Sequence, residues 1–226
     1  MGSGHNTKFV RDPIAYLKST CVSMQTKGGL IGKDFDFRKA HEHAFIDFSP
    51  WSWGSFAKQV VFTAKATGTW TGKDSILKSY YFPYIQYGSL TGGHAAVPLK
   101  GIPKTNPAYN FIFTGGVNGC SPMLLEGDSS GEVWGFHYPN SDGQKKDYPL
   151  LNLIGKSSSD IIISLDFKGT YGSKKHPNGF AFFYYQGTKW VGVTQSHLMG
   201  AANAKKGMCT MSINKDIGDD GVTIVG

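Results

Sequence analysis

The sequence predicts an α+β fold, in which a mainly antiparallel β-sandwich core is flanked by two or three helices. Its 226 residues are enough for one domain with a real core. Thirty glycines favour turns, and fifteen phenylalanines with eleven tyrosines favour strands. Because no internal repeat or low-complexity tract divides the chain, we expect one domain over residues 1–226. Residues 1–8 are expected to be either disordered or a remnant of cloning.

The first expected helix begins at Asp12 and Pro13, residue types that favour the N-cap and the first helical position. It should end near Gly28, where two glycines stand together. Residues 30–58 carry no regular hydrophobic period, so we expect irregular structure there. A second, short helix is expected at Ser196–Lys206, stopped by Gly207.

Strands are expected where branched and aromatic residues cluster between turn signals. The five-residue segment Gly127–Gly131, which begins and ends with glycine, separates two of these runs and predicts a hairpin. Residues 88–107 are rich in glycine and proline and are expected to form a loop. The expected strands are Gln59–Ala66, Tyr80–Tyr87, Ala108–Thr114, Ser121–Glu126, Glu132–Tyr138, Asp160–Phe167, Gly179–Gln186, Lys189–Thr194 and Met208–Ile213.

Charge and cysteine usage narrow the class of protein. Lys and Arg together number 23 against 16 Asp and Glu, a net charge of +7 that steers the chain toward acidic partners. No long basic run typical of a nucleic-acid arm is present, so the sign alone does not choose the partner. The three cysteines are widely spaced and form no CxxC, which argues against a disulfide framework and a structural zinc site.

A glycine-rich loop delivers a cysteine to the start of an expected strand. The segment runs Phe113-Thr-Gly-Gly-Val-Asn-Gly-Cys120. Glycines let the backbone approach a substrate closely, and loop N–H groups near Asn118 and Gly119 can converge on an oxyanion. The thiolate of Cys120 would be the nucleophile, and a nearby positive or hydrogen-bonding group must lower its pKa.

His137 is the candidate base for this cysteine. The hairpin returns the end of its second strand beside the start of its first, so Cys120 and His137 should be cross-strand neighbours. Imidazole titrates near neutral pH and suits this role. Thr114, at the end of the preceding strand, can orient the imidazole through its hydroxyl or its carbonyl. Spacing alone leaves open that Cys120 is an ordinary buried thiol.

This segment resembles the cysteine-dependent glutamine deamidases, which include Burkholderia lethal factor, the cytotoxic necrotizing factors and the chemoreceptor glutamine deamidase of chemotaxis. The shared features are Thr114 six residues before Cys120, Gly119 directly before it, and a histidine across a hairpin. The most similar local match is Burkholderia lethal factor, which also shares Val133-Trp134.

The resemblance covers only about residues 109–139 and departs from the family pattern in two places. Asn118 stands where one version of the signature has serine. Gly135 and Phe136 separate Trp134 from the histidine, where the family pattern would place the histidine directly.

The resemblance implies a protein-glutamine deamidase that acts as a bacterial toxin or effector. In this reaction Cys120, His137 and Thr114 convert a glutamine side chain of a target protein to glutamate through a thioester. The resemblance implies no cofactor or metal, and neither nucleic acid nor membrane is needed as a partner; we expect a monomer. Met1–Thr20 lacks an apolar signal-peptide core. We therefore expect secretion or injection without a classical signal, with action in the cytosol of a target cell.

Two other functions remain open. One is a papain-like cysteine peptidase or amidase, although that class usually places its cysteine at a helix N-terminus. The other is a non-catalytic β-sandwich binding module that uses the positive charge and exposed aromatic side chains, among them Trp51, Trp53 and Trp70. His41-Glu42-His43 and His94 are expected to lie in solvated loops. His197, near the start of the second expected helix, is a rival base for Cys120.

Overall fold

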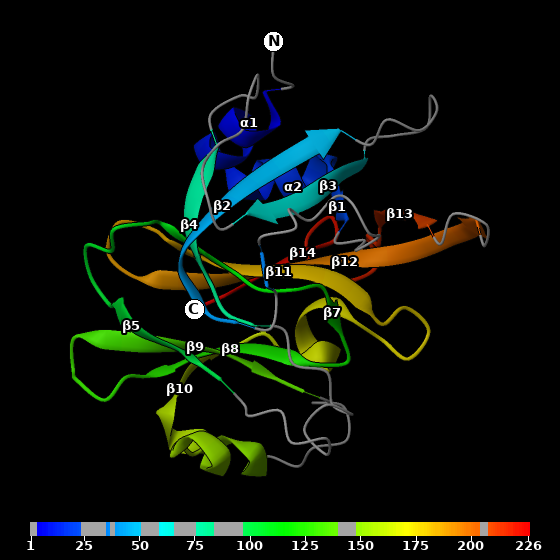
Figure 1. Cartoon of the computed structure of the whole chain (residues 1–226). Helices are drawn as coiled ribbons and strands as arrows, with labels where there is room; N and C mark the ends of the chain where they lie inside the picture. Colours follow the sequence, from blue (N-terminus) through cyan, green and yellow to red (C-terminus); the bar gives the residue numbers. More distant parts are fainter. Residues whose placement is uncertain are drawn as a thin grey trace.

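The computed structural model describes residues 4–23, 35–36, 39–50, 59–65, 76–83, 97–139, 148–203 and 208–226. Strands dominate these residues and helices are few, an arrangement consistent with the α+β class. Figure 1 shows the strands in two groups, one above the other, with the N-terminal helices on the upper group. Within the described ranges, every helix is too short or too polar to cross a lipid bilayer. The more specific β-sandwich stays a prediction.

The large sheet contains ten strands and carries the N- and C-terminal parts of the described chain. Its main path runs β1-β3-β2-β4-β6-β11-β12-β13, with β14 on β12 and β7 on β11. Neighbours are antiparallel except for the parallel pairs β1–β3 and β4–β6. The strands are β1 (Cys21–Ser23), β2 (His41–Pro50), β3 (Gln59–Lys65), β4 (Leu77–Tyr81), β6 (Phe111–Phe113), β7 (Val117–Asn118), β11 (Asn178–Tyr185), β12 (Trp190–Asn203), β13 (Met208–Ile213) and β14 (Val222–Val225).

The small sheet has four antiparallel strands in the order β10-β8-β9-β5. They are β5 (Leu99–Pro103), β8 (Ser121–Glu126), β9 (Glu132–Tyr138) and β10 (Ile161–Ser164). The helical elements are α1 (His5–Arg11), α2 (Pro13–Ser19), the 3-10 helices η2 (Pro149–Ile154) and η3 (Ser158–Asp160), and the π-helical turn η4 (Phe167–Tyr171). Each sheet therefore has its own strand path. The chain passes from β5 of the small sheet back to β6 and β7 of the large sheet, and then returns to the small sheet for β8, β9 and β10.

The two sheets share one apolar core. Leu99 and Leu124 of the small sheet lie in the same buried cluster as Ile112 and Phe183 of the large sheet. Cys120, on the chain just before β8, belongs to this cluster too. Burial of apolar area is what holds one face of the small sheet against the large one.

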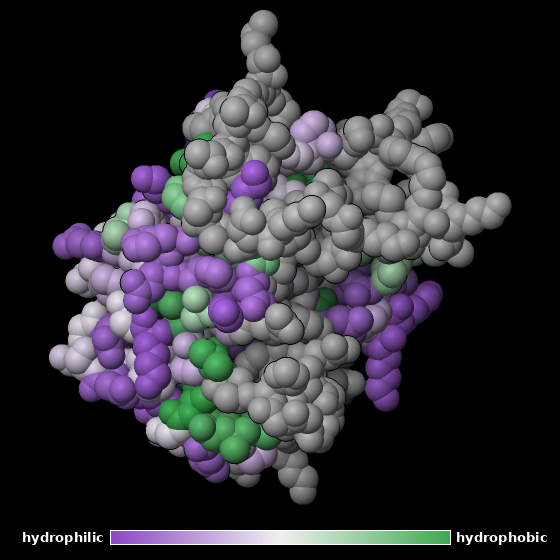
Figure 2. Space-filling model, viewed as in Figure 1, coloured by the Kyte–Doolittle hydropathy of each residue, from purple (hydrophilic) through white to green (hydrophobic). Residues whose placement is uncertain are grey.

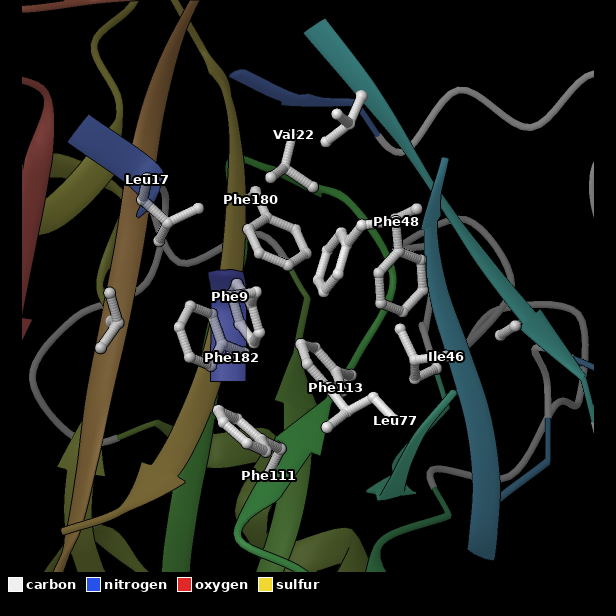
Figure 3. Packing of buried hydrophobic residues seen from close by; sticks show 14 of the residues in the cluster. Phe9, Leu17, Val22, Ile46, Phe48, Leu77, Phe111, Phe113, Phe180 and Phe182 are labelled. Carbon is white, nitrogen blue, oxygen red and sulfur yellow. The ribbon is translucent and has the colours of Figure 1, made fainter. Parts of the chain in front are cut away.

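A second core, built largely of phenylalanine, fixes the N-terminal helices on the large sheet (Figure 3). Phe9 of α1 is fully buried, and its ring lies 4.5 Å from that of Phe48 and 5.3 Å from that of Phe182, between centroids. Truncating such a fully buried phenylalanine to alanine typically costs about 3–5 kcal/mol. Asn6 is also buried and bonds to Asp47 Oδ1. Residues 5–8, which belong to the segment expected to be either disordered or a remnant of cloning, form part of α1.

The hairpin that carries the site is confirmed at the expected bounds, Ser121–Glu126 and Glu132–Tyr138. The expected strand at Met208–Ile213 is also confirmed, and that at Gln59–Ala66 is found as β3. The expected helix start is correct as well, since Asp12 caps α2 by accepting from the N–H of Ala15.

Several other expected elements are wrong. The first helix ends at Ser19 rather than near Gly28, because the chain turns into β1 and pairs with β3. No helix occupies 196–203, since these residues continue β12 and pair with β13. Within the irregular stretches expected at 30–58 and 88–107, the structure places β2 and β5. The strand expected over 108–114 is confined to β6.

Apolar surface remains exposed at one end of the molecule. Figure 2 shows apolar side chains gathered at the lower end of this face, where Figure 1 places the short helices that follow β9 and the strand β10. Leu153 of η2 and Ile162 of β10 are the exposed large apolar side chains of these elements, 64% and 41% exposed. Patches of this kind are common at surfaces that contact other proteins.

Candidate active site

Three elements bring Thr114, Cys120 and His137 into one region. Thr114 directly follows β6 in the large sheet, Cys120 directly precedes β8, and His137 lies near the end of β9 in the small sheet. The short strand β7 between them pairs Val117 and Asn118 with β11, which fixes the loop against the large sheet. The predicted site therefore lies where the ends of the two sheets meet.

The register of the hairpin is shifted by two residues from one that would place Cys120 directly opposite His137. Ser121 faces Tyr138 and Pro122 faces His137, so Cys120 lies two residues before the direct partner of the histidine. Residues in this diagonal relation typically have Cα atoms about 7–8 Å apart, with the side chains on the same face. Cys120 and His137 are thus diagonal neighbours on one face rather than directly opposed residues.

Thr114 and His137 form the clearest contact of the site. The hydroxyl Oγ1 of Thr114 lies 3.0 Å from Nδ1 of His137, and both residues are fully or almost fully buried. Either atom can donate, depending on the imidazole tautomer. This bond joins the two sheets and fixes the plane of the ring. Burial lowers the pKa of His137 to about 3, so the imidazole is neutral at neutral pH.

Cys120 follows a glycine in the left-handed conformation, and its sulfur accepts a hydrogen bond from one backbone N–H. Gly119 has φ of 74°, in the left-handed region where a side chain is disfavoured, and it directs the chain into β8. The N–H of Asn118 points to Cys120 Sγ at 3.4 Å. The sulfur therefore has a fixed position and one backbone donor aimed at it.

The ionisation expected for Cys120 is corrected by its surroundings. The residue is 4% exposed, and burial raises the pKa of its thiol to about 11, against the smaller opposing effect of the Asn118 N–H. Within the described part of the chain, the hydrogen bonds to Sγ come from Asn118 and Tyr171 rather than from His137. A thiolate–imidazolium pair at neutral pH was the expectation, but desolvation opposes both charges, and the pair is a neutral thiol and a neutral imidazole in this structure.

Tyr171 is a residue of the site that no sequence signal pointed to. It lies at the end of η4, 51 residues after the cysteine, and its side chain is fully buried. The N–H of Cys120 donates to Tyr171 Oη at 3.0 Å, and the Tyr171 hydroxyl donates to the Cys120 carbonyl at 2.6 Å. The Cys120 N–H, a candidate oxyanion donor, is thereby engaged in this structure.

The other candidate histidines that the structure describes lie outside this site. His41 and His43 belong to β2, not to a loop, and bond to the Asp36 carbonyl and to Tyr109 Oη. Among the described residues, no group of three potential ligands is placed to hold a metal ion. His197 lies in strand β12, where it bonds to Gln195, so it is not at a helix start. His94 and the three tryptophans Trp51, Trp53 and Trp70 lie outside the described residues.

The arrangement can support nucleophilic chemistry on a carbonyl carbon. It holds a thiol, a neutral imidazole oriented by a hydroxyl, and one backbone N–H directed at the sulfur. A neutral imidazole can accept the thiol proton as attack proceeds, so a permanent ion pair is not required. The chain matches no protein-family model, and no curated protein sequence is significantly similar to it.

Proposed function

We propose that this chain is a cysteine-dependent protein-glutamine deamidase. The observation that carries the proposal is the hydrogen bond between Thr114 and His137, which joins two of the three residues that the deamidase resemblance selects. These two residues are 23 positions apart and come from different sheets, so their contact is not a consequence of chain proximity. The third, Cys120, follows Gly119 in the left-handed conformation and lies on the hairpin of His137.

The proposed reaction has two halves. Cys120 Sγ attacks the carbon of a glutamine carboxamide while His137 takes the thiol proton, giving a tetrahedral oxyanion. The imidazolium then gives that proton to the departing nitrogen. Ammonia is released, and a thioester between Cys120 and the former glutamine side chain is formed. Water, deprotonated by the neutral imidazole, attacks the thioester; the proton passes to the sulfur, and the product is glutamate with free Cys120.

The oxyanion requires backbone donors near the sulfur. The N–H groups of the loop at Asn118 and Gly119 are the candidates, and that of Asn118 is already directed at Sγ in the free protein. Removing one such donor from a comparable site costs about 10²–10³ in turnover. The resting thiol and imidazole are neutral, so proton transfer would accompany attack rather than precede substrate binding.

The biological setting follows from the same resemblance. We infer a bacterial toxin or effector that acts on a protein in the cytosol of a target cell, after secretion or injection. The positive net charge of the chain favours an acidic region on that target.

One observation favours a rival function, a non-catalytic binding module. Cys120 is buried and its pKa is raised to about 11, which is the usual state of a structural thiol. A papain-like peptidase is less well supported, because Cys120 precedes the strand β8 instead of beginning a helix. The presence or absence of chemistry at Cys120 separates these functions.

The test is deamidation of proteins in a eukaryotic cytosolic extract, measured in water enriched in heavy oxygen. The wild-type chain should produce glutamate that carries heavy oxygen at specific former glutamine positions, without chain cleavage. Cys120→Ser should abolish this product, because an alcohol is a poor nucleophile without a stronger base. Cys21→Ser is the matched control, since Cys21 is equally buried and lies outside the site. Labelled glutamate formed equally by the Cys120→Ser protein would refute the proposed nucleophile.

A further inference from the structure

The Tyr171 hydroxyl contacts three groups of Cys120. It accepts from the Cys120 N–H at 3.0 Å and donates to the Cys120 carbonyl at 2.6 Å. Its oxygen also lies 3.8 Å from Sγ, within the range of a hydrogen bond to sulfur. The N–H and C=O of one residue point to the same side only when its backbone is extended. One phenol therefore holds both ends of the cysteine backbone and approaches its thiol.

The tyrosine ring is itself fixed from behind. Gly179 of β11 packs so closely that a Cβ there would lie 2.7 Å from Tyr171 Cδ2. Phe167 stands edge-on to the ring at 5.7 Å between centroids. The Thr194 hydroxyl donates to the carbonyl of Thr170 at 2.8 Å and anchors the preceding residue to β12. The hydroxyl consequently occupies a defined position against Cys120.

We propose that Tyr171 is the positioning residue of the nucleophile: its hydroxyl fixes Cys120 in the extended conformation and steadies the thiolate during attack. The inference rests on the proposed function for its catalytic consequence, but its effect on the thiol is independent of any substrate. When Sγ loses its proton, the phenol O–H can turn from the Cys120 carbonyl to the sulfur. The carbonyl then loses one hydrogen bond while the thiolate gains one, and hydrogen bonds to charged acceptors are the stronger kind.

The electrostatic direction agrees with this geometry. The Tyr171 hydroxyl and the Asn118 N–H both act to lower the pKa of Cys120, against the larger opposing effect of burial. The buried position of Tyr171 raises the pKa of its own phenol, and the nearby thiolate adds to that rise. Tyr171 thus stays protonated and able to donate at every pH at which Cys120 would react.

The experiment uses Tyr171→Phe, which removes the hydroxyl and keeps the ring that packs on Gly179. The readout is the rate of Cys120 alkylation by iodoacetamide, mapped by peptide mass spectrometry across a pH series. Loss of the donor should slow alkylation about tenfold at a fixed pH near neutrality and raise its midpoint by about one pH unit. Tyr148→Phe is the matched control, because the Tyr148 hydroxyl donates a hydrogen bond to Asp166 rather than to the cysteine.

A second variant should shift the pH midpoint of Cys120 alkylation in the opposite direction. Replacing Tyr171 alone by fluorotyrosine keeps the size of the side chain and strengthens the phenol as a donor, so the alkylation midpoint of Cys120 should fall. This arm also serves if Tyr171→Phe does not fold. An unchanged alkylation profile in either variant would overturn the inference, as would faster alkylation of Tyr171→Phe, which would identify the phenol as a block on the nucleophile.

Deamidation assays separate this inference from the proposed function. In Tyr171→Phe the kcat for labelled glutamate should fall about tenfold with little change in KM, since the phenol contacts the nucleophile and not the substrate. If the alkylation profile shifts while the wild type forms no glutamate, Tyr171 positions the thiol but the deamidase assignment is wrong. If the wild type deamidates but Tyr171→Phe changes neither the alkylation profile nor kcat, the deamidase assignment is retained and the role of Tyr171 is refuted.

Discussion

The hydroxyl of Thr114 has a single defined task, which is to hold the imidazole of His137. Thr114→Ala removes that one hydrogen bond and leaves the nucleophile and base in place. A neutral hydrogen bond contributes about 0.5–1.5 kcal/mol, so kcat for deamidation should fall by about tenfold and not to zero. Thr114→Ser keeps the hydroxyl and should retain most of the activity. Equal loss in the two variants would show that Thr114 acts through packing and not through its oxygen.

The site residues differ in how far the sequence could reveal them. Thr114, Cys120 and His137 were selected by short spacings within one segment, and local spacing is preserved when a strand, a loop and a hairpin fold. Tyr171 could not be selected in this way, because its contact with Cys120 depends on how η4 packs against β11, β12 and β14 of the large sheet. The ionisation of the pair was also not predictable, since desolvation depends on the completed core.

The loop between β7 and β8 depends on the left-handed conformation of Gly119. A Cβ at Gly119 would meet no atom within 4 Å, so Gly119→Ala introduces backbone strain without a steric clash. The left-handed region costs a residue with a side chain about 1–2 kcal/mol, and urea denaturation should show a loss of stability of about this size. Gly131→Ala is the control, since Gly131 is equally open and its φ lies outside that region. An equal loss of stability in the two variants would contradict a special requirement for glycine at position 119.

Among the elements, those with strong local signals were predicted best. The hairpin β8–β9 combines branched and aromatic strands with a glycine-flanked turn, and its bounds were found without the structure. The sequence predicts a strand that ends at Thr194 and a helix after it, because the end of β12 contains leucine, methionine and alanine, which favour helix. Pairing with β13 overrides that preference. β5 was missed because glycine and proline lie within it and its partner β9 is distant in sequence.

At the scale of the whole molecule, two fully buried histidines link stability to pH. His137 lies between the sheets, bonded to Thr114, and His197 lies in β12, bonded to Gln195. Gln195 in turn accepts from the Val22 N–H and donates to the carbonyl of Leu17, so this network fastens α2 and β1 to β12. Burial lowers the pKa of His137 to about 3 and that of His197 to about 4. Both rings are neutral in the folded protein at pH 5.

Stability should therefore fall as the pH drops below about 6.5, the usual pKa of an unfolded histidine. Between that value and about 4 the unfolded chain binds a proton at each histidine that the folded protein excludes, so acid favours unfolding. Each such proton contributes about 1.4 kcal/mol per pH unit, and the two histidines give a slope of up to about 2.7 kcal/mol per unit. His197→Gln removes one titrating ring and should reduce the slope by about 1.4 kcal/mol per unit, whatever its effect on stability at pH 7. Urea denaturation at pH 5, 5.5 and 6 measures the slope of the unfolding free energy against pH in the wild type and in His197→Gln. An unaltered slope in His197→Gln would mean that His197 is protonated in the folded protein. The hydrogen bonds around Gln195 would then differ from those described.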